Sequence, residues 1–256
     1  TNALEVVGKD LRSVRIVLVG AGAANIAVYR LLTASGVDPH AIVAVDSIGV
    51  LHRNRADIDA GRDAFAEKWR ICCETAPDTN FRDLAMALRG ADVCIAFSQS
   101  GPGVIAPQWI GGMATDAIVF ACANPAPEIW PQDALAAGAR IVATGRSDFP
   151  NQLNNSLVFP GLFRGVLDVG ASQITDGMAT AAAKALAEYA RADGLREDAI
   201  LPDMADWRTA MTVAVAAGLQ AQSEGVARRT LSRGELELSA QTAIQRVRDD
   251  MGRMFD

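Results

Sequence analysis

Short apolar runs alternate with amphipathic stretches through the first part of the chain. Five of these runs lack the polar–apolar alternation of a half-exposed strand, which is typical of strands covered on both faces of a parallel sheet. These predicted strands are residues 14–19, 42–46, 92–97, 118–123 and 140–143. Helical periodicity predicts helices over residues 2–7, 23–34, 56–69, 81–88 and 131–137. Strands that alternate with helices through short joints predict an α/β fold with a doubly wound, mostly parallel sheet.

The pattern changes after about residue 160, where predicted helices follow one another without intervening strands. These helices are residues 175–191, 207–223 and 235–254. The first is rich in alanine, so we expect it to pack closely against a neighbour. The last carries charges around most of its circumference, which is typical of a peripheral or partner-facing helix. The sequence therefore predicts one domain with a helical C-terminal elaboration.

Composition and charge narrow the class of protein. Half of the residues (50%) are hydrophobic and 21% are charged, as in a soluble globular domain. A net charge of -6 without a basic stripe argues against a nucleic-acid partner. No apolar segment reaches membrane-spanning length and no signal-peptide pattern opens the chain, so we expect no membrane partner. The four cysteines form no C-x-x-C pair and are expected to be free thiols.

A glycine loop follows the first predicted strand, with the sequence Gly20-Ala21-Gly22-Ala23-Ala24-Asn25. In a Rossmann-type fold the first glycine permits a tight turn and the second lets the backbone approach a pyrophosphate at the helix N-terminus. Asn25 stands at the third glycine position of that pattern. Asp46 ends the next strand, where an acid would bind the 2′-hydroxyl of the adenine ribose. The alternative is a tight turn without a ligand, but the combination favours a dinucleotide site formed by residues 20–25 and Asp46.

The residues around Asp46 bear on the choice of cofactor. A carboxylate at this position favours NAD slightly over NADP, because it would repel a 2′-phosphate. However, His52, Arg53 and Arg55 follow closely and could neutralise that phosphate. The sequence is therefore compatible with either NAD or NADP as the cofactor.

Three further polar loops follow predicted strands, where an open α/β sheet binds its ligand. They are residues 98–103, 123–128 and 144–155. Ser98 is a predicted cofactor contact. Asn124, followed by proline, offers a neutral amide directly after a buried strand, and the third loop supplies more asparagine amides. Each loop alone could be ordinary turn chemistry, but three at one edge predict a binding site.

Several of these strings resemble the malic enzymes of the short, prokaryote-type branch. They are NALEVVGK (residues 2–9), GAGAA (20–24), ANPAPEI (123–129), ATGRSDFPNQ (143–152), NN (154–155) and FPGLFRG (159–165). The resemblance covers roughly residues 1–225, which predicts a nucleotide-binding domain over residues 1–227 and a helical tail over residues 228–256. It departs from the family pattern at Asn25 and in the tail.

The resemblance implies oxidative decarboxylation of malate to pyruvate and CO₂ by a cytoplasmic homodimer, with NAD or NADP as hydride acceptor and Mg²⁺ or Mn²⁺ assisting. It also implies roles for single residues. Gly20, Gly22 and Asp46 match dinucleotide positions, and Asn124 matches an asparagine near both the nicotinamide and the substrate. The pair Asn154 and Asn155 matches the asparagines that contact malate.

Groups for proton transfer are scarce in this chain, although malate oxidation needs a general base, a general acid and a metal. Lysine occurs only at 9, 68 and 184, tyrosine only at 29 and 189, and histidine only at 40 and 52. None lies in the three loops, so packing or surface roles are expected. The family places its catalytic Tyr and Lys and its metal-binding carboxylates upstream. We therefore expect a fragment or processed chain that lacks them, is inactive alone and needs an N-terminal catalytic domain.

Two other classes of protein remain open from the residues. One is another NAD(P)-dependent oxidoreductase, of the amino-acid or methylene-tetrahydrofolate dehydrogenase type. The other is a non-catalytic nucleotide sensor, in which the long last helix would be a partner surface.

Overall fold

The computed structural model describes residues 1–75 and 83–255, with side chains as far as residue 250, and its contacts separate into two compact units. The first unit comprises Thr1–Leu153 with Arg196–Asp198, and the second comprises Asn154–Leu195 with Ala199–Asp256. This division differs from the predicted boundary after residue 227, which marks where the family resemblance fades. The last helix begins at Arg233, close to that boundary.

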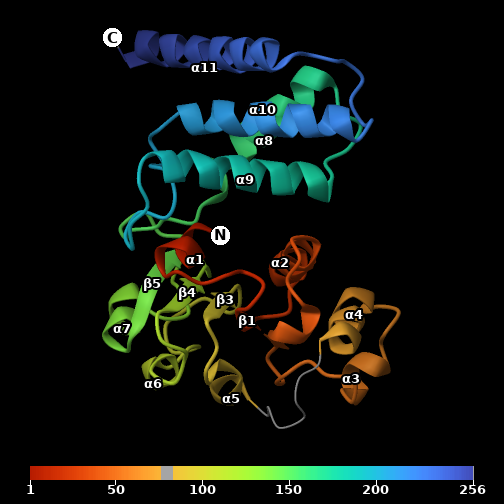
Figure 1. Cartoon of the computed structure of the whole chain (residues 1–256), viewed down its shortest axis with the longest axis vertical. Coiled ribbons are helices and arrows are strands. Elements are labelled where there is room, and N and C mark those ends of the chain that lie inside the picture. Colours follow the sequence, from red (N-terminus) through yellow and green to blue (C-terminus); the bar gives the residue numbers. More distant parts are fainter. Residues whose placement is uncertain (76–82, 256) are drawn as a thin grey trace. The chain divides into compact units, whose positions relative to one another are not determined.

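The first unit is built on a parallel five-stranded sheet with the order β2-β1-β3-β4-β5 (Figure 1). The strands are β1 (Ile16–Val19), β2 (Ile42–Val45), β3 (Val93–Ala96), β4 (Ala117–Ala121) and β5 (Ala139–Thr144). Every residue of β1, β2 and β3 is buried, as the absence of polar alternation predicts. The register aligns the carboxyl ends of all five strands at one edge, so the loops that follow them converge there.

Helices cover both faces of this sheet. In Figure 1, α1 (Asn2–Val6) and α2 (Ala23–Ala34) lie on one side, and α5 (Leu84–Leu88) and α6 (Pro107–Ile110) lie on the other. A further helix, α7 (Pro131–Ala136), packs on β5. In the sheet, β2 lies on one side of β1 and β3 lies on the other. The connections β1–β2 and β2–β3 therefore cross the sheet in opposite directions. Because such crossovers are right-handed, their helices lie on opposite faces of the sheet. The predicted doubly wound α/β fold is confirmed.

Residues 56–69 were predicted as one helix, and that prediction is wrong. They form α3 (Ala56–Asp59), a turn over residues 60–65, and the first part of α4 (Ala66–Glu74). Gly61, a poor helix former, lies in the turn. The predicted helix over residues 81–88 corresponds to α5, which begins at Leu84 because the Asp83 carboxylate accepts the N–H of Met86 at 2.9 Å. Residues 81 and 82 lie outside the described residues.

The second unit is helical. It contains the short 3₁₀ turn η2 (Asn155–Leu157) and the helices α8 (Phe159–Val169), α9 (Asp176–Ala192), α10 (Arg208–Ser223) and α11 (Arg233–Phe255). The last three confirm the predicted helices to within about two residues. The sequence did not predict α8, which packs on α10 through Gly161 and Gly165. A methyl group on either glycine would lie 2.3 Å from the carbonyl oxygen of Ala210 or Ala214.

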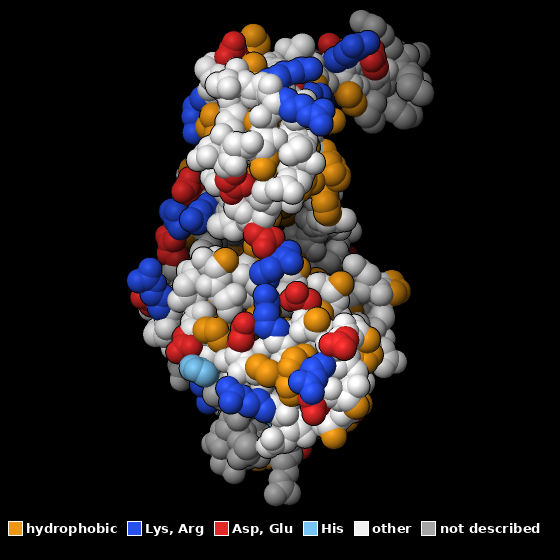
Figure 2. Space-filling model, turned by 90° about the vertical axis from the view of Figure 1, so that its right-hand side faces the viewer, with side chains coloured by type: hydrophobic (Ala, Val, Ile, Leu, Met, Phe, Trp, Pro, Cys, Tyr) orange, Lys and Arg blue, Asp and Glu red, His pale blue; other side chains and the backbone are white. Residues whose placement is uncertain are grey.

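The surface and the thiols agree with the expectations from composition. On the face shown in Figure 2, basic and acidic side chains are interspersed without a continuous basic stripe among the described residues. All four cysteines are free, and Cys72, Cys94 and Cys122 are buried. Over residues 1–75 and 83–255, no helix has the length and apolar character that crossing a membrane requires.

Candidate nucleotide-binding site

The glycine loop joins β1 to α2 at the carboxyl edge of the sheet. Gly20 has a φ of +94°, and a methyl group on it would lie 2.4 Å from the carbonyl oxygen of Phe97, so only glycine fits between β1 and β3. Gly22 is the N-cap of α2, and a methyl group there would meet nothing within 4 Å. The loop is therefore closed against the sheet at Gly20 and open at Gly22, and this open cradle at a helix N-terminus fits a pyrophosphate.

Asn25 replaces the third glycine and ties the helix to the strand before it. Its Nδ2 donates to the carbonyl oxygens of Val19 and Gly20, both at 2.8 Å, and the residue is 2% exposed. Its side chain therefore faces its own chain, and only its backbone belongs to the helix N-terminus. Within the predicted loop, Gly22, Ala23 and Ala24 are exposed, whereas Ala21 and Asn25 are buried.

A cavity of about 430 Å³ lies beside the glycine loop. Gly20, Asp46 and Ser98, which follow β1, β2 and β3, all line it. The strand order places β2 and β3 on opposite sides of β1, so the cavity lies at the point where the direction of winding reverses. Open α/β sheets bind their ligands at this point.

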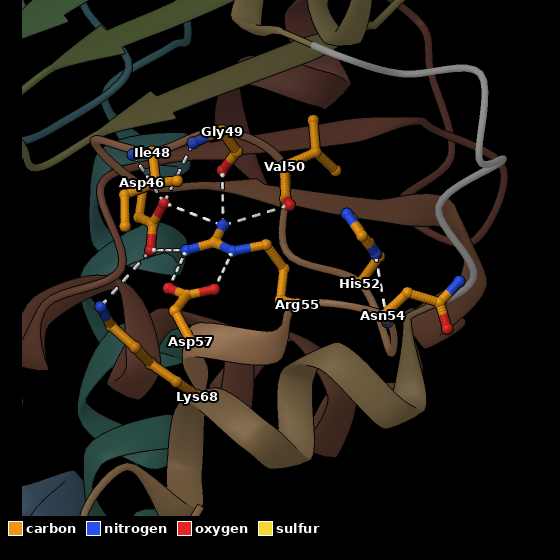
Figure 3. Close-up of polar contacts among 9 residues, drawn as sticks. All are labelled: Asp46, Ile48, Gly49, Val50, His52, Asn54, Arg55, Asp57 and Lys68. Atoms are coloured by element: carbon orange, nitrogen blue, oxygen red, sulfur yellow. Dashed lines mark hydrogen bonds and ion pairs between the residues drawn. The ribbon is translucent and has the colours of Figure 1, made fainter. Parts of the chain in front are cut away.

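The carboxylate of Asp46 is held by its own chain (Figure 3). Arg55 donates to both of its oxygens at 3.1 Å, and the backbone N–H groups of Ile48 and Gly49 donate to Oδ1 at 3.0 and 3.1 Å. Burial alone would raise the pKa of Asp46, but the hydrogen bonds and charge of Arg55, together with these N–H groups, outweigh it and lower the pKa below 3.8. Asp46 is therefore ionised, with much of its acceptor capacity already used.

Arg55 is shared between two acids. It also donates to Asp57 through Nε and Nη2, both at 2.7 Å, and these bonds lower the pKa of Asp57 to about 2. The other two candidates for a phosphate contact have different partners. Arg53 donates to the carbonyl oxygen of Cys73, and Nδ1 of His52 accepts the N–H of Asn54.

Lys68, expected to have a packing or surface role, lies beside Asp46. Its Nζ is 3.6 Å from Oδ2 of Asp46 (Figure 3). The turn over residues 60–65 explains this position, because a continuous helix from Ala56 would carry Lys68 away by about 1.5 Å per residue. No local signal in the sequence identifies it.

Glu128, for which the sequence predicts no role, binds the cavity-lining residue Ser98. It is fully buried and accepts the N–H and hydroxyl of Ser98 at 2.8 and 3.0 Å and the N–H of Ala123 at 3.1 Å. One carboxylate therefore joins the loops after β3 and β4. The only sequence signal is an acid that closes the Asn-Pro string in the family pattern.

Asn124 is exposed at the carboxyl edge, directly after that junction. Its amide lies against Gly145, where a methyl group would be 3.0 Å from Oδ1. The loop is held from the other side by Arg146, whose Nη1 donates to the carbonyl oxygen of Pro125 at 3.0 Å. Arg146 also binds both carboxylate oxygens of Asp148 at 2.8 Å. The side chain of Asn124 makes no hydrogen bond within residues 1–75 and 83–250 and can face a ligand.

Asn154 and Asn155, the predicted malate contacts, are the first residues of the second unit. Asn154 caps η2, and its Oδ1 accepts the N–H and the hydroxyl of Ser156 at 3.0 and 2.9 Å. Asn155 is exposed. Their predicted contact with malate stays a prediction.

The scarce lysine and tyrosine side chains mostly have structural partners. Tyr29 is fully buried and donates to Glu74 at 2.7 Å, and Lys9 pairs with Asp92 at 2.8 Å. Lys184 borders a groove of about 700 Å³ between α9 and α10. In the described part of the chain, no three His, Cys, Asp or Glu side chains are grouped so that they could hold a metal ion.

Comparison with known proteins assigns the family. The family model for the NAD-binding domain of malic enzymes matches residues 1–222. The chain belongs to the malic enzymes. This match gives no support to the amino-acid or methylene-tetrahydrofolate dehydrogenase alternative, or to a nucleotide sensor.

Relatives of this malic enzyme chain include the bifunctional malic/malolactic enzyme of Bacillus subtilis, 42% identical over 92% of the chain and 55% of the relative. The NADP-dependent malic enzyme of Halomonas elongata is 42% identical over 89% of the chain and 55% of the relative. The NAD-dependent malic enzyme of Geobacillus stearothermophilus is 41% identical over 89% of the chain and 45% of the relative. The chain thus spans about half the length of these curated relatives.

Solved structures of malic enzymes are similar as well. The Entamoeba histolytica enzyme has a TM-score of 0.96 and 45% identity, covering 100% of this chain and 52% of that one. The Pyrococcus horikoshii enzyme has a TM-score of 0.91 and 41% identity, covering 99% of this chain and 58% of that one. The first match includes residues 228–256, so this segment of the malic enzyme chain has a structural counterpart although the family model ends before it.

Proposed function

We propose that this chain supplies the nucleotide site of a malic enzyme that oxidises and decarboxylates malate to pyruvate and CO₂. The observation that carries the proposal is the open cradle at Gly22, in the loop whose Gly20 lines a cavity of about 430 Å³ together with Asp46 and Ser98. Membership of the malic enzymes gives the reaction class. NAD or NADP supplies the hydride acceptor when bound.

The residues of this chain bind and orient in this proposal. The N-terminus of α2 and the backbone of residues 22–24 hold the pyrophosphate, and Asp46 and Ser98 border the nucleotide. The amide of Asn124, fixed between Gly145 and the Glu128 junction, faces the nicotinamide and substrate. Asn154 and Asn155 contact malate.

The rest of the catalytic apparatus is assigned to an N-terminal catalytic domain. We propose that this domain carries the general acid and base and the ligands of Mg²⁺ or Mn²⁺, because the described residues of this chain present no grouped set of metal-binding side chains. By likeness to the family, we also propose a cytoplasmic homodimer.

Nucleotide titration of the 256-residue chain tests the binding site. Calorimetry, or the fluorescence of the reduced nicotinamide, should show saturable binding of NAD(H) or NADP(H). No saturable binding of any of the four forms at millimolar concentration would overturn the proposal.

A complementation assay tests the reaction. The chain alone should form no NADH or NADPH from malate, with or without Mn²⁺. The amino-terminal half of a related malic enzyme, supplied in the same polypeptide or in trans, should restore turnover. Robust turnover by the chain alone would show that its catalytic groups have been misassigned.

A further inference from the structure

We propose that Lys68 binds the 2′-phosphate of NADP, so that this chain accepts NADP as well as NAD in spite of the acid at position 46. The inference rests on the proposed nucleotide site and names its specificity-determining residue. It starts from one distance, the 3.6 Å between Nζ of Lys68 and Oδ2 of Asp46.

The charges around Asp46 balance only when Lys68 is included. Arg55 is a single cation that binds two carboxylates, those of Asp46 and Asp57. These three groups together carry one net negative charge, which would repel an incoming phosphate. The ammonium of Lys68, which lies beside the Asp46 carboxylate, neutralises this net negative charge (Figure 3).

Arg55 is fully occupied and cannot turn toward a ligand. Its side chain is 9% exposed, and Nε, Nη1 and Nη2 all donate to Asp46 or Asp57. Nη1 also approaches the carbonyl oxygens of Gly49 and Val50 at 3.5 and 3.4 Å. Swinging it out would remove the Arg55 bonds to both oxygens of the Asp46 carboxylate, which is 9% exposed, and the contact with the buried carbonyl oxygen of Val50. Leaving a buried acceptor without a donor costs about 1–3 kcal/mol.

Lys68, in contrast, has donors to spare. Its side chain is 27% exposed, it lies 5.8 Å from the centre of the Phe65 ring, and its ammonium makes no hydrogen bond within the described residues. An ammonium offers three N–H donors on a flexible stem. Lys68 can therefore move by an ångström or two toward a phosphate without breaking an existing hydrogen bond.

The place of the phosphate follows from the place of the ribose. In a dinucleotide site of this kind, the acid after the second strand faces the 2′-oxygen of the adenine ribose. The phosphate of NADP is attached to that same oxygen. A cation 3.6 Å from the carboxylate is then within reach of the phosphate oxygens.

Equilibrium titration of the 256-residue chain with NADP⁺ and NAD⁺ tests the assignment without any assay of turnover. Lys68→Met should weaken NADP⁺ binding by about tenfold or more, as expected for the loss of a charge-assisted hydrogen bond, and change NAD⁺ binding by less than about twofold. Lys68→Arg, which keeps the charge, should retain most of the NADP⁺ affinity. The pair 2′,5′-ADP and 5′-AMP, which differ only in the 2′-phosphate, should show the same contrast.

The matched control is Arg62→Met, which removes one positive charge from the neighbouring surface, where the Arg62 side chain is 60% exposed. It should change neither affinity by more than about twofold, because solvent and salt largely screen an exposed charge. The assignment is wrong if wild type binds NAD⁺ but not NADP⁺. It is also wrong if Lys68→Met weakens both nucleotides equally or NADP⁺ no more than Arg62→Met does. If wild type binds neither nucleotide, the proposed function falls and this inference falls with it.

Discussion

A methyl group on the α-carbon of Gly20 would lie 2.4 Å from the carbonyl oxygen of Phe97, a distance that no side chain tolerates. Two residues later, a methyl group on Gly22 would meet no atom within 4 Å. The two glycines of one loop therefore have separable roles, one in folding and the other in binding.

Gly20→Ala should destabilise the protein. The substitution forces a residue with a Cβ into a φ of +94° and against a backbone carbonyl, which together should cost about 2–5 kcal/mol of unfolding free energy. Urea unfolding followed by far-UV circular dichroism measures the loss. An unchanged midpoint would show that the β1–α2 loop can move away from β3.

Gly22→Val should instead abolish nucleotide binding in a folded protein. The valine side chain would occupy the open space at the N-terminus of α2, and the weaker N-cap should cost only about 1 kcal/mol. Calorimetric titration with NADH, alongside urea unfolding, separates the two effects. Binding at wild-type affinity would place the pyrophosphate elsewhere.

Glu128→Ala should loosen the junction of the loops after β3 and β4. It leaves the N–H groups of Ser98 and Ala123 without their acceptor, so the free energy of unfolding should fall by about 3 kcal/mol. Glu128→Gln should cost less, because one oxygen still accepts from Ser98 while the amide nitrogen faces the N–H of Ala123. A loss of binding in Glu128→Gln that exceeds its loss of stability would mark Glu128 as a positioning residue for Ser98 and Asn124.

The lowered pKa of Asp46 predicts a pH dependence of stability. Because the folded-state pKa lies below the unfolded value near 3.8, the stabilisation is present above that pH and is lost as the pH falls through the folded-state pKa. The stability of wild type relative to Asp46→Asn should therefore be greatest at neutral pH and shrink below about pH 4. Urea midpoints of both proteins between pH 7 and 3 measure this difference.

The sheet could be predicted from the sequence because buried parallel strands leave a local signature of unbroken apolar residues. The convergence of the loops could also be predicted, because parallel strands end at the same edge of a sheet. The structure places Gly20, Asp46 and Ser98 around one cavity at this edge, and their contact with a nucleotide stays a prediction.

What could not be predicted depends on tertiary contacts. α8 contains Pro160, Gly161 and Gly165, residues of low helix propensity, and packing on α10 outweighs that preference. Lys68 reaches Asp46 only because the chain turns back after α3, and Glu128 meets Ser98 from a loop thirty residues away. No local pattern marks the position of Lys68, and the only sequence signal for Glu128 is its place at the end of the Asn-Pro string.

The contact of Gly161 and Gly165 with α10 also bears on which substitutions this protein can tolerate. The outward side chains of the same helix, Phe159, Phe163 and Leu167, are 44%, 49% and 64% exposed. In a random-mutagenesis library selected only for folding, polar residues should therefore be accepted at these three bulky positions. Glycine should persist at 161 and 165, because any side chain there would meet the backbone of α10. Apart from Pro160, these glycines are the residues of α8 with the lowest helix propensity, yet they should be the last to be replaced.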